Sequence, residues 1–83
     1  MDEATAIQIA TAGRPAHVVP APYALRGCEP RIIELCAGSG GAGTLVRDVR
    51  VWIVRFQGGV AWVELAVDDV TGTIVRVQRS RTS

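Results

Sequence analysis

Gly58-Gly59 restricts the fold of this chain more than any other feature of its sequence, because alternating apolar runs flank the pair at 49–56 and 60–67. Both glycines reach positive φ without strain, and a two-residue turn of this kind between such runs is typical of a β-hairpin. Pairing Gln57 with Val60 fixes the register of that hairpin. It sets Phe56 opposite Ala61, Val54 opposite Val63 and Trp52 opposite Leu65.

A second turn, residues 68–72, predicts a third strand over 73–79. Asp68 ahead of Thr71-Gly72 is ordinary turn chemistry, since the carboxylate accepts hydrogen bonds from the backbone N–H groups that follow it and the glycine takes positive φ. Asp68 and Asp69 can also be read as a carboxylate pair for acid–base or metal chemistry, although adjacent residues at a strand end point apart. Pairing Val67 with Thr73 gives an inner side made of Trp52, Val54, Phe56, Val63, Leu65, Val75 and Val77.

Residues 2–13 have the punctuation of a short helix. Asp2 is suited to be the N-cap, Gly13 to end the helix, and Pro15 prevents its continuation. About eleven residues of helix are marginal alone, so packing against a sheet must stabilise it. A narrow apolar stripe at helical spacing is suited to that packing, and it consists of Ala6, Ile7, Ile9 and Ala10.

The chain has 83 residues, which is enough for one domain and too few for two. We therefore predict a single α+β domain over 1–83, in which the N-terminal helix packs on a three- to four-stranded antiparallel meander. His17–Leu25 is the candidate fourth strand, at one edge, because its two prolines remove backbone donors. A Gly-rich insertion at about 27–48 separates it from the hairpin, and Arg31–Cys36 within that insertion fits either one helical turn or a short strand.

Charge and hydropathy exclude two classes of partner. The net charge of +1 supplies no electrostatic footprint for nucleic acid, and no apolar run approaches the roughly 18 residues that span a bilayer. We therefore expect neither nucleic-acid binding nor membrane insertion. No cationic and apolar leader precedes the acidic residues at positions 2 and 3, so no signal peptide is expected and the compartment stays unknown.

The glycine run Gly38–Gly43 follows an apolar segment and is similar to the first motif of methyltransferases that use S-adenosylmethionine. In that family the glycines let the backbone approach the cofactor, and a helix follows them. Only residues 44–48 separate this run from the next expected strand, which is too few for that helix. We therefore expect a surface loop and no bound cofactor, with a cofactor-binding fragment as the alternative interpretation.

The two cysteines, Cys28 and Cys36, lie eight positions apart. Their spacing is not that of a zinc site, and neither has a histidine nearby in the sequence that would mark a catalytic thiol. A disulfide between them would constrain the insertion in an oxidising compartment, whereas two reduced, buried thiols fit equally well. His17 is expected to be a half-exposed strand residue and not a catalytic base.

The outer side of the predicted sheet mixes apolar and charged side chains, and we expect the domain to bind through it. Trp62 beside Arg55 is either an anchor for a partner or a cation–π pair that shields the sheet. Two copies could share this side, since burying an apolar sheet face between them enlarges a small core. The candidate partner-binding residues are Val51, Ile53, Arg55, Trp62 and Ile74.

Three segments together resemble the PepSY domain: the helix Glu3–Ala10, the run VWIVRF at 51–56, and Asp69–Val77 with the form D-x-T-G-x-I-x-x-V. The resemblance implies a helix-and-meander fold, an exported or membrane-anchored protein, and binding or inhibition, of proteases among others, in place of catalysis. The related cystatin fold also wraps a sheet around a helix, but residues 57–61 do not match the cystatin inhibitory loop.

The sequence therefore predicts a small, non-enzymatic binding or inhibitory module without a cofactor. Its partner is expected to be a protein, such as a protease, or a second copy of the chain. A domain with a purely structural role is the remaining alternative.

Overall fold

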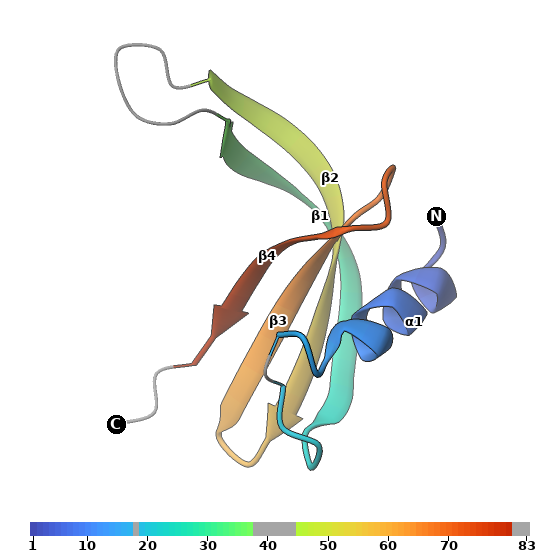
Figure 1. The fold of residues 1–83 in the computed structure, drawn as a ribbon, viewed down its shortest axis with the longest axis vertical. Coiled ribbons are helices and arrows are strands. Elements are labelled where there is room, and N and C mark those ends of the chain that lie inside the picture. The colour runs from blue at the N-terminus through green and yellow to red at the C-terminus, as the bar shows by residue number, and fades with distance from the viewer. Residues whose placement is uncertain (18, 38–44, 81–83) are drawn as a thin grey trace.

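The computed structural model describes residues 1–17, 19–37 and 45–80 and confirms the predicted α+β arrangement. One helix, α1 (Glu3–Gly13), precedes an antiparallel sheet in the order β1-β2-β3-β4. Each strand lies beside the next one along the chain, so the sheet is a meander (Figure 1). The strands are β1 (Ala24–Ala37), β2 (Leu45–Gly58), β3 (Ala61–Asp68) and β4 (Ile74–Arg79).

Helix α1 begins and packs as the sequence predicts. The Asp2 carboxylate caps it by accepting a hydrogen bond from the Thr5 N–H at 2.8 Å. Ala6 and Ala10 are fully buried against the sheet, and their small side chains let the helix lie close to it. The last helical residue is Gly13, where a methyl group would lie 2.5 Å from the δ-carbon of Ile74. This glycine therefore permits a close approach between the helix end and the sheet.

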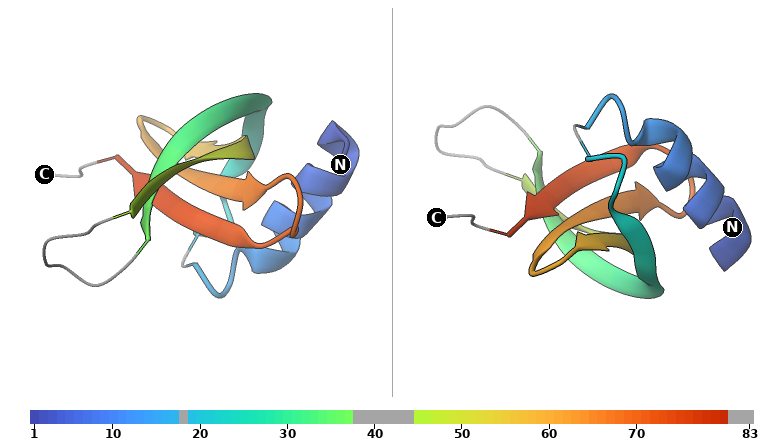
Figure 2. Two further views of the ribbon diagram at one scale, coloured as in Figure 1. Left: turned by 90° about the horizontal axis from the view of Figure 1, so that it is seen from above. Right: turned by 90° about the horizontal axis from the view of Figure 1, so that it is seen from below.

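The sheet is strongly twisted and curved (Figure 2). Side chains are buried on both of its faces. On the face turned away from α1, the long strands β1 and β2 curve over β3 and β4 (Figure 2). The first core, under α1, contains Ala6, Ala10, Val19, Val54, Phe56, Val63, Leu65 and Val67. The second core, on the opposite face, contains Ile33, Val49, Val51, Ile53 and Ala66, with Leu35 and Val75 packed against it.

The turn between β2 and β3 lies one residue later than predicted. Gly58 belongs to β2 and pairs with Ala61, so the two turn residues are Gly59 and Val60. Gly59 takes the positive φ of 63°, whereas Gly58 leaves room for the ring of Tyr23, which a methyl group would approach to 2.5 Å. The predicted register is therefore wrong by two residues, but every side chain of β2 and β3 keeps its predicted face because the side-chain period of a strand is two. The observed partners are Phe56 and Val63, Val54 and Leu65, and Trp52 and Val67.

The turn between β3 and β4 has the predicted chemistry and a different register. The carboxylate of Asp68 accepts hydrogen bonds from the N–H groups of Val70 at 2.8 Å and Thr71 at 3.0 Å, and Gly72 has a φ of 71°. A bulge opposite Ala66 and Val67 then shifts the pairing. In the observed register, Leu65 pairs with Val77, and both face the first core. Val67 pairs with Ile74, where the prediction had Thr73. Val75 packs against the second core and not, as predicted, against the first.

The fourth strand is not the predicted one. Residues 14–17 and 21–22 form turns after α1. The guanidinium of Arg14 donates to the carbonyl oxygens of Pro20, Ala21 and Tyr23 and so ties this part of the chain to the end of the helix. The edge strand is β1, which takes up the first half, residues 27–37, of the predicted insertion at 27–48. Arg31–Cys36 is therefore strand and not helix. The glycine run at 38–43 lies outside the described residues.

Candidate functional site

Three of the predicted partner-binding residues do not lie on an exposed face. Val51 is 1% exposed and Ile53 is 4% exposed, because the arch of β1 and β2 encloses both in the second core. Ile74 lies on the α1 side, where the bulge in the β3–β4 pairing directs it toward the first core. The expectation of an exposed apolar outer face around these residues is therefore wrong.

Arg55 and Trp62 do lie together on the face turned away from α1. The central guanidinium carbon of Arg55 is 4.6 Å from the centre of the Trp62 ring, which is a cation–π contact. One guanidinium nitrogen is 3.7 Å from a carboxylate oxygen of Glu64. The Nε atom of Arg55 is buried without a hydrogen-bond partner among the described residues. The pair shields this part of the sheet, and a role as a partner anchor stays a prediction.

The candidate functional site is the free edge of β1. This strand pairs with β2 on one side only and is 14 residues long, whereas the other edge strand, β4, has 6. Two large apolar side chains of β1 are exposed, Leu25 at 45% and Ile32 at 60%. Glu29 and Arg31 form an ion pair along the same strand. A long edge with exposed apolar residues is a template for pairing with another strand.

An open hollow of about 460 Å³ lies beside this edge, next to the start of α1. Its apolar walls come from Pro30, Ile32 and Trp52. Arg31, Arg50 and Asp69 contribute charge. The hollow therefore offers both apolar surface and charged groups to whatever lies along β1.

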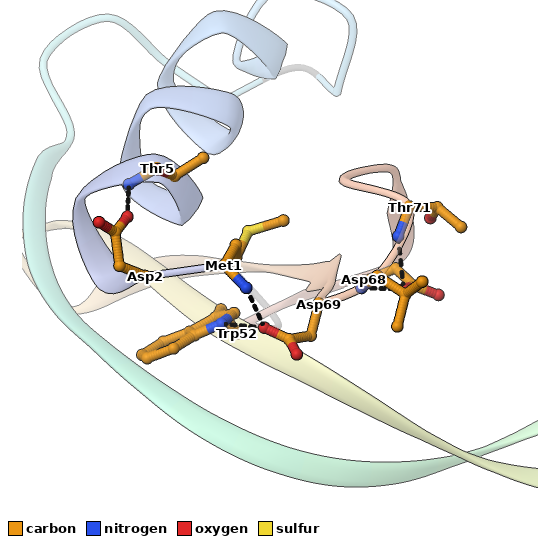
Figure 3. Close-up of polar contacts among 8 residues, drawn as sticks. Met1, Asp2, Thr5, Trp52, Asp68, Asp69 and Thr71 are labelled. Carbon is orange, nitrogen blue, oxygen red and sulfur yellow. Dashed lines mark hydrogen bonds and ion pairs between the residues drawn. The ribbon is translucent and has the colours of Figure 1, made fainter.

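Asp69 is fixed at the wall of this hollow by two donors (Figure 3). The indole N–H of Trp52 donates to its carboxylate at 2.9 Å, and the amino group of Met1 donates to the same oxygen at 3.0 Å. The hydrogen bond from Trp52, followed by that from the amino group, lowers the pKa of Asp69 below its ordinary value. Trp52 lies on the α1 side of the sheet and Trp62 on the other, as the sequence predicts.

The carboxylates of Asp68 and Asp69 accept hydrogen bonds from different donors. The carboxylate of Asp68 is used by the backbone of its own turn, whose N–H groups at Thr71 and Val70 lower its pKa. The carboxylate of Asp69 is used by Trp52 and the amino group. The two side chains thus serve different structural partners, and the turn chemistry predicted for Asp68 is confirmed.

Of the two alternatives for the cysteines, a disulfide does not fit the structure. Cys28 carries a free thiol, and Cys36 lies eight positions further along the same strand, about 26 Å away at 3.3 Å per residue. A disulfide requires α-carbons within about 7 Å. Burial, with smaller contributions from Glu3 and Glu29, raises the pKa of the Cys28 thiol to about 11, so this thiol is protonated and weakly nucleophilic at neutral pH.

His17 and the metal-ligating residue types do not form a further site among the described residues. His17 is half-buried as expected, but it lies in the turn after α1, where its carbonyl oxygen accepts a hydrogen bond from Arg79. Within residues 1–17, 19–37 and 45–80, no three His, Cys, Asp or Glu side chains are placed to hold a metal ion. No helix in this described part of the chain is long and apolar enough to cross a membrane.

Sequence reasoning missed the β1 edge, although one signal for it is present. Pro30 lies within an alternating segment whose Ile33 and Leu35 share a face, and a proline inside such a pattern indicates an edge strand. No protein family, curated protein or solved structure matches the chain.

Proposed function

We propose that this protein is a small, non-enzymatic binding module whose β1 edge takes up an extended segment of a protein partner. The observation that carries the proposal is the unpaired edge of a 14-residue strand with exposed apolar side chains. In strand addition, main-chain hydrogen bonds supply affinity and the pockets beside alternate side chains supply specificity. The β1 edge and its hollow offer both.

The direction of the backbone groups supports this proposal. The C=O of Arg50 accepts a hydrogen bond at 2.9 Å from the residue that follows β3, so the backbone groups of Arg50 point toward β3. Backbone groups of successive residues in an antiparallel strand point to alternate sides, so those of Val51 point toward β1 and meet Arg31. The groups of Pro30 and Ile32, on either side of Arg31, therefore point to the free edge.

The free edge consequently presents a defined set of donors and acceptors. Cys28, Ile32 and Glu34 each turn an N–H and a C=O outward, and Pro30 turns out a C=O alone. Proline is accommodated at position 30 because its nitrogen faces the free edge and not β2, so no hydrogen bond to β2 is lost. An added strand thus finds several consecutive partners along the middle of β1.

The hollow supports a preference among partner segments. An apolar side chain of the added strand would lie against Ile32 and Trp52. Arg50, which is exposed, has no ion pair within the described residues, whereas Asp69 and Arg31 are each paired. The exposed guanidinium of Arg50, whose charge reaches Asp69 without a contact ion pair, favours a partner segment that carries an acidic residue near its apolar one.

The resemblance to PepSY domains extends the proposal to inhibition of a protease. A strand laid along β1 would be held in the extended form, and a protease segment held in this way is constrained. Inhibition would therefore accompany binding where that segment borders the active site.

Selection from a displayed library of extended peptides tests this function. Glu34→Pro removes one outward N–H, and its nitrogen faces solvent, so the fold is expected to persist. Glu34→Ala is the matched control, since it removes the carboxylate and keeps the N–H. We expect selected peptides to bind the parent and Glu34→Ala alike and to bind Glu34→Pro at least about tenfold more weakly.

Circular dichroism and the urea midpoint establish that both variants are folded. The proposal fails if no peptide is selected, or if the selected peptides bind the parent and a folded Glu34→Pro with equal affinity.

A further inference from the structure

We infer that the strand added to β1 is the β1 of a second copy of this chain, running antiparallel, with Ile32 of both copies on a two-fold axis. This inference rests on the proposed function, because it uses the same edge. The pairing would join two four-stranded sheets into one continuous sheet. An isologous contact of this kind is the commonest way in which a chain pairs with itself.

The hydrogen bonds around the axis follow from which residues face the edge. With Ile32 on the axis, each Ile32 N–H donates to the Ile32 C=O of the other copy. Glu34 of each copy then lies opposite Pro30 of the other, and its N–H donates to that Pro30 C=O. The missing N–H of Pro30 is tolerated in this register because Glu34 supplies the donor for the pair.

The neighbouring registers are less favourable. An axis at Arg31 or Glu34 would set two like charges directly opposite each other. An axis at Pro30 would bring together two residues that both lack a donor, so no bond would form at the centre. An axis at Ile33 would set the exposed Ile32 against the carboxylate of Glu34. The register centred on Ile32 avoids all of these.

The side chains on the axis support the same register. Among the described large apolar residues that are more than half exposed, Val60 and Val70 lie in turns and Ile32 lies within a strand. On the axis, the two Ile32 side chains contact each other beside the wall formed by Pro30 and Trp52. The most exposed apolar group of the described strands is thereby buried. On the opposite face, Arg31 meets Ile33 and Glu29 meets Leu35, so no like charges face each other.

Sedimentation of the purified chain from micromolar to millimolar concentration measures the dimer. We expect reversible dimerisation of the parent. Ile32→Arg places two like charges on the axis and is expected to raise the dissociation constant at least about tenfold. Leu25→Arg is the matched control, because it also replaces an exposed apolar residue of β1 but lies beyond the irregularity at 25–27, seven positions from the axis. It is expected to dimerise like the parent.

Cross-linking tests the register directly. In a chain that carries Cys28→Ser and Cys36→Ser, Ile32→Cys is expected to form a disulfide-linked dimer under mild oxidation, since hydrogen-bonded residues on the axis have α-carbons about 5.5 Å apart. Leu25→Cys in the same background is expected to stay unlinked.

The inference is overturned if the parent sediments as a monomer at every concentration, or if Ile32→Arg and Leu25→Arg dimerise equally well. Peptide selection then decides the proposed function separately. Peptides that bind the parent and not Glu34→Pro would support strand addition at β1 by a partner other than a second copy of the chain. The absence of such peptides would overturn the proposed function as well as the dimer.

Discussion

Replacing Val51 by alanine tests whether the face turned away from α1 is a packed core. Val51 is 1% exposed within the second core, and Val70, 88% exposed in a turn, provides a control with the same substitution. Two lost methyl groups remove about 1.6 kcal/mol of transfer free energy at about 0.8 kcal/mol each. A cavity of roughly 50 Å³ that does not collapse adds about 1.2 kcal/mol. We expect Val51→Ala to lower the free energy of unfolding by about 2–3 kcal/mol, and Val70→Ala by less than about 0.5 kcal/mol.

Urea unfolding followed by tryptophan fluorescence measures this difference. At about 0.05–0.15 kcal/mol per residue, a chain of 83 residues has a total stability of about 4–12 kcal/mol, so the expected loss is a large share of it. With a slope of about 1 kcal/mol per molar urea, the midpoint of Val51→Ala moves down by about 2–3 M. Trp52 and Trp62 report from opposite faces and should show one transition. Equal midpoints for Val51→Ala and Val70→Ala would refute a packed second core and restore the exposed face that the sequence suggests.

Three further outcomes are expected. Gly58→Ala should lower the free energy of unfolding by about 1–3 kcal/mol, because its methyl group would lie 2.5 Å from the Tyr23 ring. Gly27→Ala is the control: its methyl group would meet nothing within 4 Å, so the same urea titration should show almost no change in stability. The lowered pKa of Asp69 stabilises the folded chain above its ordinary pKa of 3.8, and this contribution is lost as the pH falls through the folded pKa. The urea midpoints of the parent and Asp69→Asn should therefore differ at pH 6 and converge in acid, and a constant difference would count against the assigned bonds. The Cys28 thiol has a pKa of about 11, against an ordinary 9.0, so it should react with a disulfide reagent about a hundredfold more slowly in the folded chain than in urea. Mass spectrometry of the peptide that contains Cys28 measures the two rates, and equal rates would contradict the burial of this thiol.

In the β2–β3 hairpin, the face on which each side chain lies could be predicted from the sequence even though the register could not. Trp52 and Trp62 lie on opposite faces, as predicted. The two-residue error in the predicted register does not change this, because two residues are one full period of a strand. The helix cap at Asp2 and the turn at Asp68 are local chemistry, in which a carboxylate accepts from N–H groups two or three residues ahead. Such features depend on neighbours in the chain and are visible in it.

The second core and the β1 edge could not be predicted, because both depend on pairing between segments distant in sequence. Val51 and Ile53 face away from α1 and therefore look exposed until Ile33, brought by β1, packs beside them. The bulge that turns Ile74 toward the first core has no signature in its own segment. Only Pro30 hinted at an edge, and a single proline does not say which strand it borders.

Burial on both sides of the sheet leaves this molecule one dimension in which to grow. The apolar side chains on both faces of the sheet are already packed in the two cores, whereas a neighbour laid alongside β1 meets the exposed Leu25 and Ile32. Any enlargement of the structure by association is thus expected to widen it in the plane of its strands and to leave its thickness unchanged.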